Sequence, residues 1–195
     1  MEFQNKVVIV TGATRGIGKG IALSFAKEGA SVALIGRNPE ALQAVSDEVK
    51  GFGGPCDFYS CDVANTQNVV ETVNKILDKY KCIDILVNNA GITKDNLLLR
   101  MSEADWDDVL DTNLRGIFNF TKAVSKAMLK AKKGKIISIA SIIGITGNAG
   151  QANYAAAKAG LIGLTQSIAR EYASRGVQAN GIIPGVFRSA MTDAL

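Results

Sequence analysis

Short apolar runs alternate with longer amphipathic stretches along the whole chain. The runs are rich in β-branched and aromatic residues and cover residues 6–10, 31–35, 56–61, 83–87, 135–140 and 177–183. The stretches between them are long enough for several helical turns and cover residues 16–28, 39–50, 66–80, 103–130 and 154–173. This order predicts repeated βαβ units.

The predicted strands are apolar nearly throughout, without the alternation of a half-exposed strand. This pattern is typical of strands that are buried on both faces. We therefore predict an α/β fold, a doubly wound and mainly parallel sheet of the Rossmann type with helices on both faces. Ligands of such sheets bind beyond the carboxyl ends of the strands, so the residues that follow each strand are the candidates for a site.

The composition is that of a globular domain. The chain has 195 residues, of which 47% are apolar and 21% are charged. A chain of this length buries roughly 70% of the surface that its unfolded form exposes, and we expect residues 1–195 to form a single domain. The start, MEFQNKVVIV, has charged residues ahead of a short apolar run, which is typical of neither a signal peptide nor a membrane span. We expect a cytoplasmic protein.

Charge and cysteine content argue against two kinds of site. The net charge is +4, and basic residues alternate with acidic ones over most of the chain, so no nucleic-acid-binding surface is predicted. Cys56, Cys61 and Cys82 lack the spacing of metal ligands, and the chain has no histidine. We predict no metal site and expect the cysteines to be reduced thiols.

Five lysines cluster near the end of the helix predicted for 103–130 and the turn after it, and we expect them to lie away from any compensating carboxylate: Lys126, Lys130, Lys132, Lys133 and Lys135. A solvated helix end explains such a cluster, because the helix dipole favours cations there. A docking surface for an acidic protein partner explains it as well.

A glycine-rich turn, TGATRGIGKG, follows the first predicted strand. Glycines at this position let backbone N–H groups approach a phosphate, and the N-terminus of the next helix favours its negative charge. A tight turn without a ligand would also use glycine, but the place directly after the first strand favours a dinucleotide site. The residues predicted to bind the cofactor here are Gly12, Ala13, Thr14, Arg15, Gly16, Ile17 and Gly18.

The end of the second strand predicts which dinucleotide binds. NAD-selective sites usually place a carboxylate there for the ribose 2′-hydroxyl, whereas this chain has Arg37. Arg15 could approach a 2′-phosphate from the other side, giving two cations for one dianion. We therefore predict NADP(H), although two solvated arginines are the alternative.

Two further segments follow later strands. Asp62 and Val63 follow the third strand, where a carboxylate could accept a hydrogen bond from the adenine amino group. Asn89, Ala90 and Gly91 follow the fourth. Each segment could be an ordinary turn, but both are expected on the side of the sheet where a dinucleotide would run.

These turns, together with Asn113 in TNLRG, Ser141 in SIASIIG, YAAAK at 154–158 and PG at 184–185, carry a family resemblance. In their order and spacing the chain resembles the short-chain dehydrogenases/reductases over nearly its whole length. More narrowly, residues 88–116 and 150–165 resemble members that reduce 3-oxoacyl thioesters on acyl carrier protein in fatty-acid synthesis. The resemblance implies an NADPH-dependent oxidoreductase that forms a homotetramer.

The resemblance also implies roles for single residues. Tyr154 would protonate the 3-keto oxygen, and Ser141 would bind the substrate carbonyl. Asn113 would position a water that relays protons to Lys158, and Lys158 would hold the nicotinamide ribose. Tyr154, Lys158 and Phe187 would contact the cofactor.

The acid–base pair has to work without histidine. A free tyrosine has a pKa of about 10, and Lys158 lies one helical turn from Tyr154. A cation about 5 Å away, at an effective dielectric constant of about 20, would lower that pKa by about two units. We therefore predict that Lys158 shifts the pKa of Tyr154 towards neutrality.

The chain departs from the family pattern in three places. Ala140 stands where these reductases often have a second serine, and VFRSAMT at 186–192 replaces a more acidic loop. The family also continues past the position of Leu195 with a substrate-covering helix, another helix and a seventh strand. We expect the domain to lack these parts, which would leave 177–183 as an exposed edge of the sheet.

Two alternatives stay open. The chain could be a short-chain reductase of another ketone, such as a quinone or a sugar. It could also be a nucleotide-binding protein without turnover.

Overall fold

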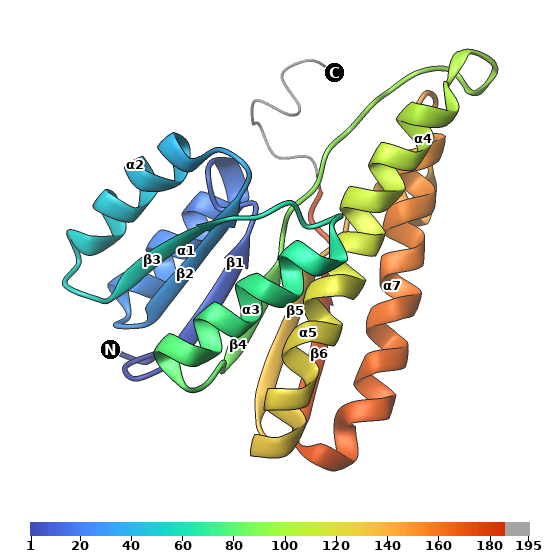
Figure 1. The fold of residues 1–195 in the computed structure, drawn as a ribbon. Helices are drawn as coiled ribbons and strands as arrows, with labels where there is room; N and C mark the ends of the chain where they lie inside the picture. Colours follow the sequence, from blue (N-terminus) through green and yellow to red (C-terminus); the bar gives the residue numbers. More distant parts are fainter. Residues whose placement is uncertain (186–195) are drawn as a thin grey trace.

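The computed structural model describes residues 1–185, which form a six-stranded parallel sheet in the order β3-β2-β1-β4-β5-β6 (Figure 1). The strands are β1 (Val7–Thr11), β2 (Ser31–Gly36), β3 (Cys56–Ser60), β4 (Ile85–Asn88), β5 (Gly134–Ile139) and β6 (Val177–Ile182). The predicted α/β fold is confirmed, and each strand begins and ends within two residues of its predicted bounds.

Helices cover both faces of the sheet (Figure 1). One face packs against α1 (Gly16–Lys27) and α2 (Pro39–Lys50). The other packs against α3 (Thr66–Tyr80), α5 (Gly116–Ala131) and α7 (Ala152–Tyr172). None of the described helices, within residues 1–185, combines the length and the apolar character that a membrane span requires.

The two-sided packing explains why the strands are apolar throughout. In β1, Val8 and Val10 pack in the core beneath α1 and α2, whereas Val7 and Ile9 pack in the core beneath α3 and α5. Successive side chains of a strand point to opposite faces, so a strand between two helical layers needs an apolar residue at every position.

The segment predicted as one helix over 103–130 is interrupted. It consists of α4 (Glu103–Leu110), the π-helical turn η2 (Asp111–Arg115) and α5. The short elements η1 (Leu98–Arg100), α6 (Ile143–Thr146) and η3 (Ala173–Arg175) were not predicted either. A π-turn inside a helix often marks a functional site, and this one carries Asn113.

A buried carboxylate ties together the amino ends of three strands. Asp84, directly before β4, accepts a hydrogen bond from the N–H of Val7 in β1 (3.0 Å) and pairs with Lys133, directly before β5 (2.7 Å). Burial alone would raise the pKa of Asp84. The bonds from Lys133 and Val7, with the charges of Lys133 and Lys6, outweigh it and hold that pKa below its ordinary value.

Replacement of Asp84 by Asn is expected to lower the free energy of unfolding by roughly 2 kcal/mol at neutral pH, because hydrogen bonds to a charged group are lost. The pKa of Asp84 is lower in the folded than in the unfolded chain. Its contribution is therefore fully present above the unfolded pKa of about 3.9 and is lost as the pH falls through the folded pKa. Urea unfolding across a pH series should show the difference between the two proteins shrinking below about pH 4.

Asp47→Asn is the matched control, because Asp47 is exposed and its partner Lys50 lies 4.0 Å away. It should leave stability nearly unchanged. A destabilisation by Asp84→Asn that does not vary with pH would contradict the electrostatic explanation.

Candidate active site

A cleft of about 400 Å³ runs along the carboxyl ends of the strands. It crosses the boundary between β1 and β4. From β1 the sheet continues through β2 to β3 on one side, and from β4 through β5 to β6 on the other. Doubly wound sheets bind ligands at this point, where the strand order reverses. The sequence-predicted residues that line it are Gly12, Thr14, Arg15, Gly16, Ile17, Gly18, Arg37, Asp62, Val63, Asn89, Ala90, Gly91, Ser141, Tyr154 and Lys158.

Two predicted site residues of the described part of the chain, Ala13 and Asn113, do not line the cleft, and a third lies outside that part. Ala13 is fully buried, and its N–H donates to the carbonyl of Ile35, so it supports the turn from behind, and its contact with the cofactor stays a prediction. Asn113 is also fully buried, behind the cleft wall. Phe187 lies outside the described residues, as does the rest of the segment 186–192.

The glycine turn is shaped by close backbone approaches. A Cβ on Gly18 would lie 2.2 Å from the carbonyl oxygen of Gly12, so only glycine fits. Gly16 has a φ of +54° and open space beside it, as a backbone that admits a phosphate requires. The turn at the start of α1 therefore fits a dinucleotide pyrophosphate.

Two polar side chains brace this turn, one at the end of β1 and one directly after β4. The hydroxyl of Thr11 accepts the N–H groups of Asn89 (2.9 Å) and Ala90 (3.0 Å), and the Asn89 amide donates to the carbonyl of Thr11 (3.0 Å). The Asn89 side chain therefore holds the glycine turn in place. Its position after a strand did not predict this role. Sequence reasoning missed Thr11, although it opens the TGATRGIG segment.

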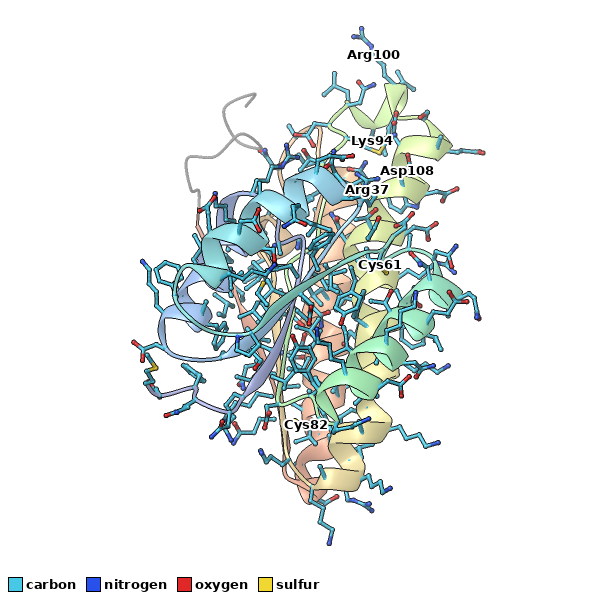
Figure 2. All side chains as sticks on the ribbon, turned by 60° about the vertical axis from the view of Figure 1, so that its left-hand side comes forward. Arg37, Cys61, Cys82, Lys94, Arg100 and Asp108 are labelled. Carbon is cyan, nitrogen blue, oxygen red and sulfur yellow. The ribbon has the colours of Figure 1, made fainter. Side chains whose placement is uncertain are left out.

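Two arginines lie exposed at one end of the cleft. Arg15 precedes α1 and Arg37 follows β2, and neither forms an ion pair within residues 1–185. Lys94, by contrast, is paired with Asp108 at 2.6 Å (Figure 2). Two cations without carboxylate partners in this part of the chain fit an anionic group such as a 2′-phosphate.

The segment after β3 forms the neighbouring wall. Asp62 and Val63 line the cleft, and the Asp62 carboxylate accepts the N–H of Ala64 (3.0 Å). One carboxylate oxygen is thereby used to fix the turn. Asp62 is exposed, so its carboxylate is accessible to a hydrogen-bond donor of a ligand.

Asn113 holds the segment after β4 in place. Its amide donates to the carbonyl of Ile92 (2.8 Å) and accepts the N–H of Ile92 (2.8 Å). Both polar ends of the side chain are used, so it positions the wall formed by Gly91 and Ile92. The predicted role of Asn113 in positioning a water stays a prediction.

Ser141, Tyr154 and Lys158 meet at the other end of the cleft. Ser141 follows β5 and accepts the N–H of Ile143 (3.2 Å). Tyr154 and Lys158 lie one turn apart on α7, with the lysine Nζ 5.6 Å from the centre of the tyrosine ring. Lys158 is 3% exposed, and its Nζ donates to the carbonyl of Ile139 (2.7 Å).

The predicted shift of the tyrosine pKa is wrong in direction. Burial raises the pKa of Tyr154 above its ordinary value, a hydrogen bond with Ser141 opposes the rise, and the charge of Asp95 adds to it. Burial also lowers the pKa of Lys158 to about 8. Above that pH the amine is largely uncharged, which weakens its effect on the phenol in the alkaline range.

Two amides beside Tyr154 were not predicted. Gln151 is buried, donates to the carboxylate of Asp95 (2.8 Å) and accepts from the amide of Asn148 (3.0 Å). Both amides line the cleft. Gln151 lies three residues before Tyr154, at the start of α7. This closeness in sequence to Tyr154 is the one signal that could have predicted Gln151 as a site residue.

The lysine cluster lies far from this cleft. Lys133 pairs with Asp84 (2.7 Å), so the expectation of no compensating carboxylate is wrong for this residue. The cluster ends at Lys135, the second residue of β5, whereas Ser141 follows this strand, and a strand of six residues spans about 20 Å. A partner that docks on the cluster would not face the cleft of the same chain.

The cysteines are dispersed. Cys56 and Cys61 are buried and Cys82 is exposed, all as free thiols. Figure 2 shows Cys82 at the end of the molecule opposite Arg37. Within residues 1–185, no three Cys, Asp or Glu side chains are grouped as a metal site.

Comparisons with known proteins agree with this geometry. The family model described as short chain dehydrogenase matches residues 6–195. The chain is 49% identical over 192 residues to "3-oxoacyl-[acyl-carrier-protein] reductase FabG" of Staphylococcus epidermidis, covering 98% of this chain and 79% of that protein. The protein of the same description from Thermotoga maritima is 45% identical, covering 100% of this chain and 79% of the relative.

Solved structures share the fold. The structure described as NAD⁺-bound xylitol dehydrogenase superposes with a TM-score of 0.93 and 35% identity, covering 95% of this chain and 72% of the other. A putative short-chain alcohol dehydrogenase from Sinorhizobium meliloti gives a TM-score of 0.94 and 34% identity, covering 98% and 76%.

Proposed function

The chain belongs to the short-chain dehydrogenase family, and from that premise we propose that it reduces 3-oxoacyl-acyl-carrier protein to the 3-hydroxyacyl form with NADPH. One observation carries the proposal. A single cleft has Ser141, Tyr154 and Lys158 at one end and Arg15 and Arg37 at the other. The named function of relatives at 45% and 49% identity supports the substrate class.

Tyr154 is the proposed general acid. Bound NADPH would supply the hydride to the 3-carbon of the substrate. The alkoxide that develops is a stronger base than a phenolate, so a tyrosine with a raised pKa still donates its proton downhill. A raised pKa also keeps the phenol protonated throughout the neutral range, as reduction requires.

Ser141 and Lys158 are proposed to assist the acid from two sides. The Ser141 hydroxyl, which bonds Tyr154, is placed to stabilise negative charge on the carbonyl oxygen. Lys158 is held by the carbonyl of Ile139 (2.7 Å) at the cleft wall, and its amine can donate to the hydroxyls of the nicotinamide ribose. Its pKa of about 8 means that this donor is charged at neutral pH and loses its charge in the alkaline range.

Two rival functions are separable by experiment. The similarity to xylitol dehydrogenase favours a sugar or polyol as the other substrate class, and a nucleotide-binding protein without turnover remains the third possibility. NADPH oxidation should be followed with acetoacetyl-carrier protein and, at equal concentration, with free ketones and ketoses. Preference for the carrier-bound substrate supports the proposal. Preference for a ketose would assign the rival, and cofactor binding without oxidation by any of them would favour the protein without turnover.

We also propose that the protein assembles as a homotetramer and keep its cytoplasmic location as a prediction. Leu98 and Leu99 in η1 and Phe118 in α5 are large apolar side chains that are exposed in the single chain. Subunit contacts in an assembly would cover such side chains. Light scattering on the eluted protein tests the oligomeric state.

A further inference from the structure

A buried asparagine outside the cleft is bonded to one of the cleft walls. Asn119 lies one turn inside α5 and is 4% exposed. Its amide nitrogen donates to the carbonyl of Val63 (2.9 Å) and to that of Ala64 (3.3 Å). Its oxygen accepts the hydroxyl of Thr66 (3.2 Å). Both N–H donors of the side chain are therefore used on one short segment.

That segment is the wall at the Arg37 end of the cleft. It begins with Asp62 and Val63, which line the cleft, and continues into the start of α3. Its own contacts are local: the Asp62 carboxylate accepts the N–H of Ala64, and Asn68 accepts the N–H of Asp62. Among these contacts, only the hydrogen bonds from Asn119 connect the carbonyl groups of the segment to α5. These bonds therefore set how far the segment reaches into the cleft.

Packing of Val63 against α5 also holds this segment in place. A Cβ on Gly116, the first residue of α5, would lie 2.5 Å from Cγ2 of Val63. Gly116 is helical, so glycine is not required there by backbone conformation. It is required because Val63 packs directly on the helix. Asn119 and Gly116, one turn apart on the same face of α5, thus both hold Val63 against this helix.

We propose that Asn119 is a positioning residue for the adenine end of the dinucleotide cleft, acting through Val63 and Ala64. The inference rests on the proposed cofactor site. Asn119 does not reach the end that carries Ser141, Tyr154 and Lys158, so it governs cofactor affinity and not the chemical step.

The test uses Asn119→Asp and Asn119→Leu with adenosine 5′-diphosphate and adenosine 2′,5′-bisphosphate as probes in titration calorimetry. Aspartate has nearly the same shape and keeps an acceptor for Thr66, but it lacks both N–H donors. We expect both variants to bind each probe about tenfold more weakly, corresponding to about 1.4 kcal/mol. KM for NADPH should rise by a similar factor, while kcat at saturating NADPH stays within about twofold.

A second variant avoids any buried polar change. Gly116→Ala favours the helix by its propensity and displaces Val63 by steric contact, so it should weaken both probes while the protein stays folded. Ser125→Ala is the matched control. Ser125 is a buried polar residue of the same helix, but its hydroxyl donates to the carbonyl of Thr121 in α5 (2.6 Å) and accepts the hydroxyl of Tyr172 (2.9 Å), away from the wall. It should bind both probes as the unmodified chain does.

The outcomes separate this inference from the proposed function. Equal binding of the two probes by the unmodified chain would contradict the NADP assignment, yet weaker binding by the Asn119 variants would still support the positioning role. Unchanged probe binding in both Asn119→Leu and Gly116→Ala would overturn it. A fall in kcat equal to the loss of affinity would overturn it as well, because the residue would then act on the reacting end.

Discussion

Tyr154→Phe is expected to reduce kcat by roughly 10³-fold, because a positioned proton donor contributes 10²- to 10⁴-fold to such a step. The substitution keeps the ring, which packs near Lys158, and removes only the hydroxyl. Cofactor affinity should change little, since the phosphate and adenine contacts lie at other parts of the cleft. NADPH oxidation with acetoacetyl-carrier protein gives the rate, and fluorescence titration with NADPH gives the affinity.

Tyr80→Phe is the matched control for the loss of a phenolic hydroxyl. The Tyr80 hydroxyl donates to the carboxylate of Asp57 (2.5 Å), between α3 and β3 and outside the cleft. Turnover should not change in that variant. A Tyr154→Phe enzyme within tenfold of the parent, about 1.4 kcal/mol of barrier, would remove Tyr154 from the role of acid.

The sequence predicted most of the fold because the relevant signals are local. The run VVIV at 7–10 in β1 is apolar at every position, which only a strand between two layers requires. The glycine turn was also predictable, since Gly16 and Gly18 report backbone geometry at their own positions. The convergence of Ser141, Tyr154 and Lys158 followed from motif order and was found at one end of the cleft.

Properties set by distant segments could not be predicted in this way. The pKa of Tyr154 depends on burial, which the spacing to Lys158 does not report, and the predicted direction was therefore wrong. The pairing of Lys133 with Asp84 joins residues 49 positions apart in sequence. Asn119 and Val63 are likewise joined across 56 positions, and asparagine in a helix carries no signal of its partner.

Arg37→Asp is expected to reverse the preference between NADPH and NADH. At a separation of about 5 Å and a water-like dielectric constant of about 80, one cation attracts a dianion by about 1.7 kcal/mol. Replacing the cation by an anion removes this attraction and adds a repulsion of the same size. NADPH binding therefore weakens by about 3 kcal/mol, or roughly a hundredfold in affinity. NADH lacks the 2′-phosphate, so its binding should change far less. Titration of parent and variant with both cofactors measures the difference.

Arg170→Asp separates a local contact from the overall charge. Arg170 is exposed in the last turn of α7, outside the cleft, and its replacement changes the net charge by the same amount. If both variants lost NADPH affinity equally, the effect would come from the general field of a basic protein. A local contact predicts loss only in Arg37→Asp, with a residual contribution from Arg15 that weakens as salt is added. Tighter binding of NADH than of NADPH by the unmodified chain would show that these arginines do not select the phosphate, since two cations beside a 2′-phosphate can only favour the cofactor that carries it.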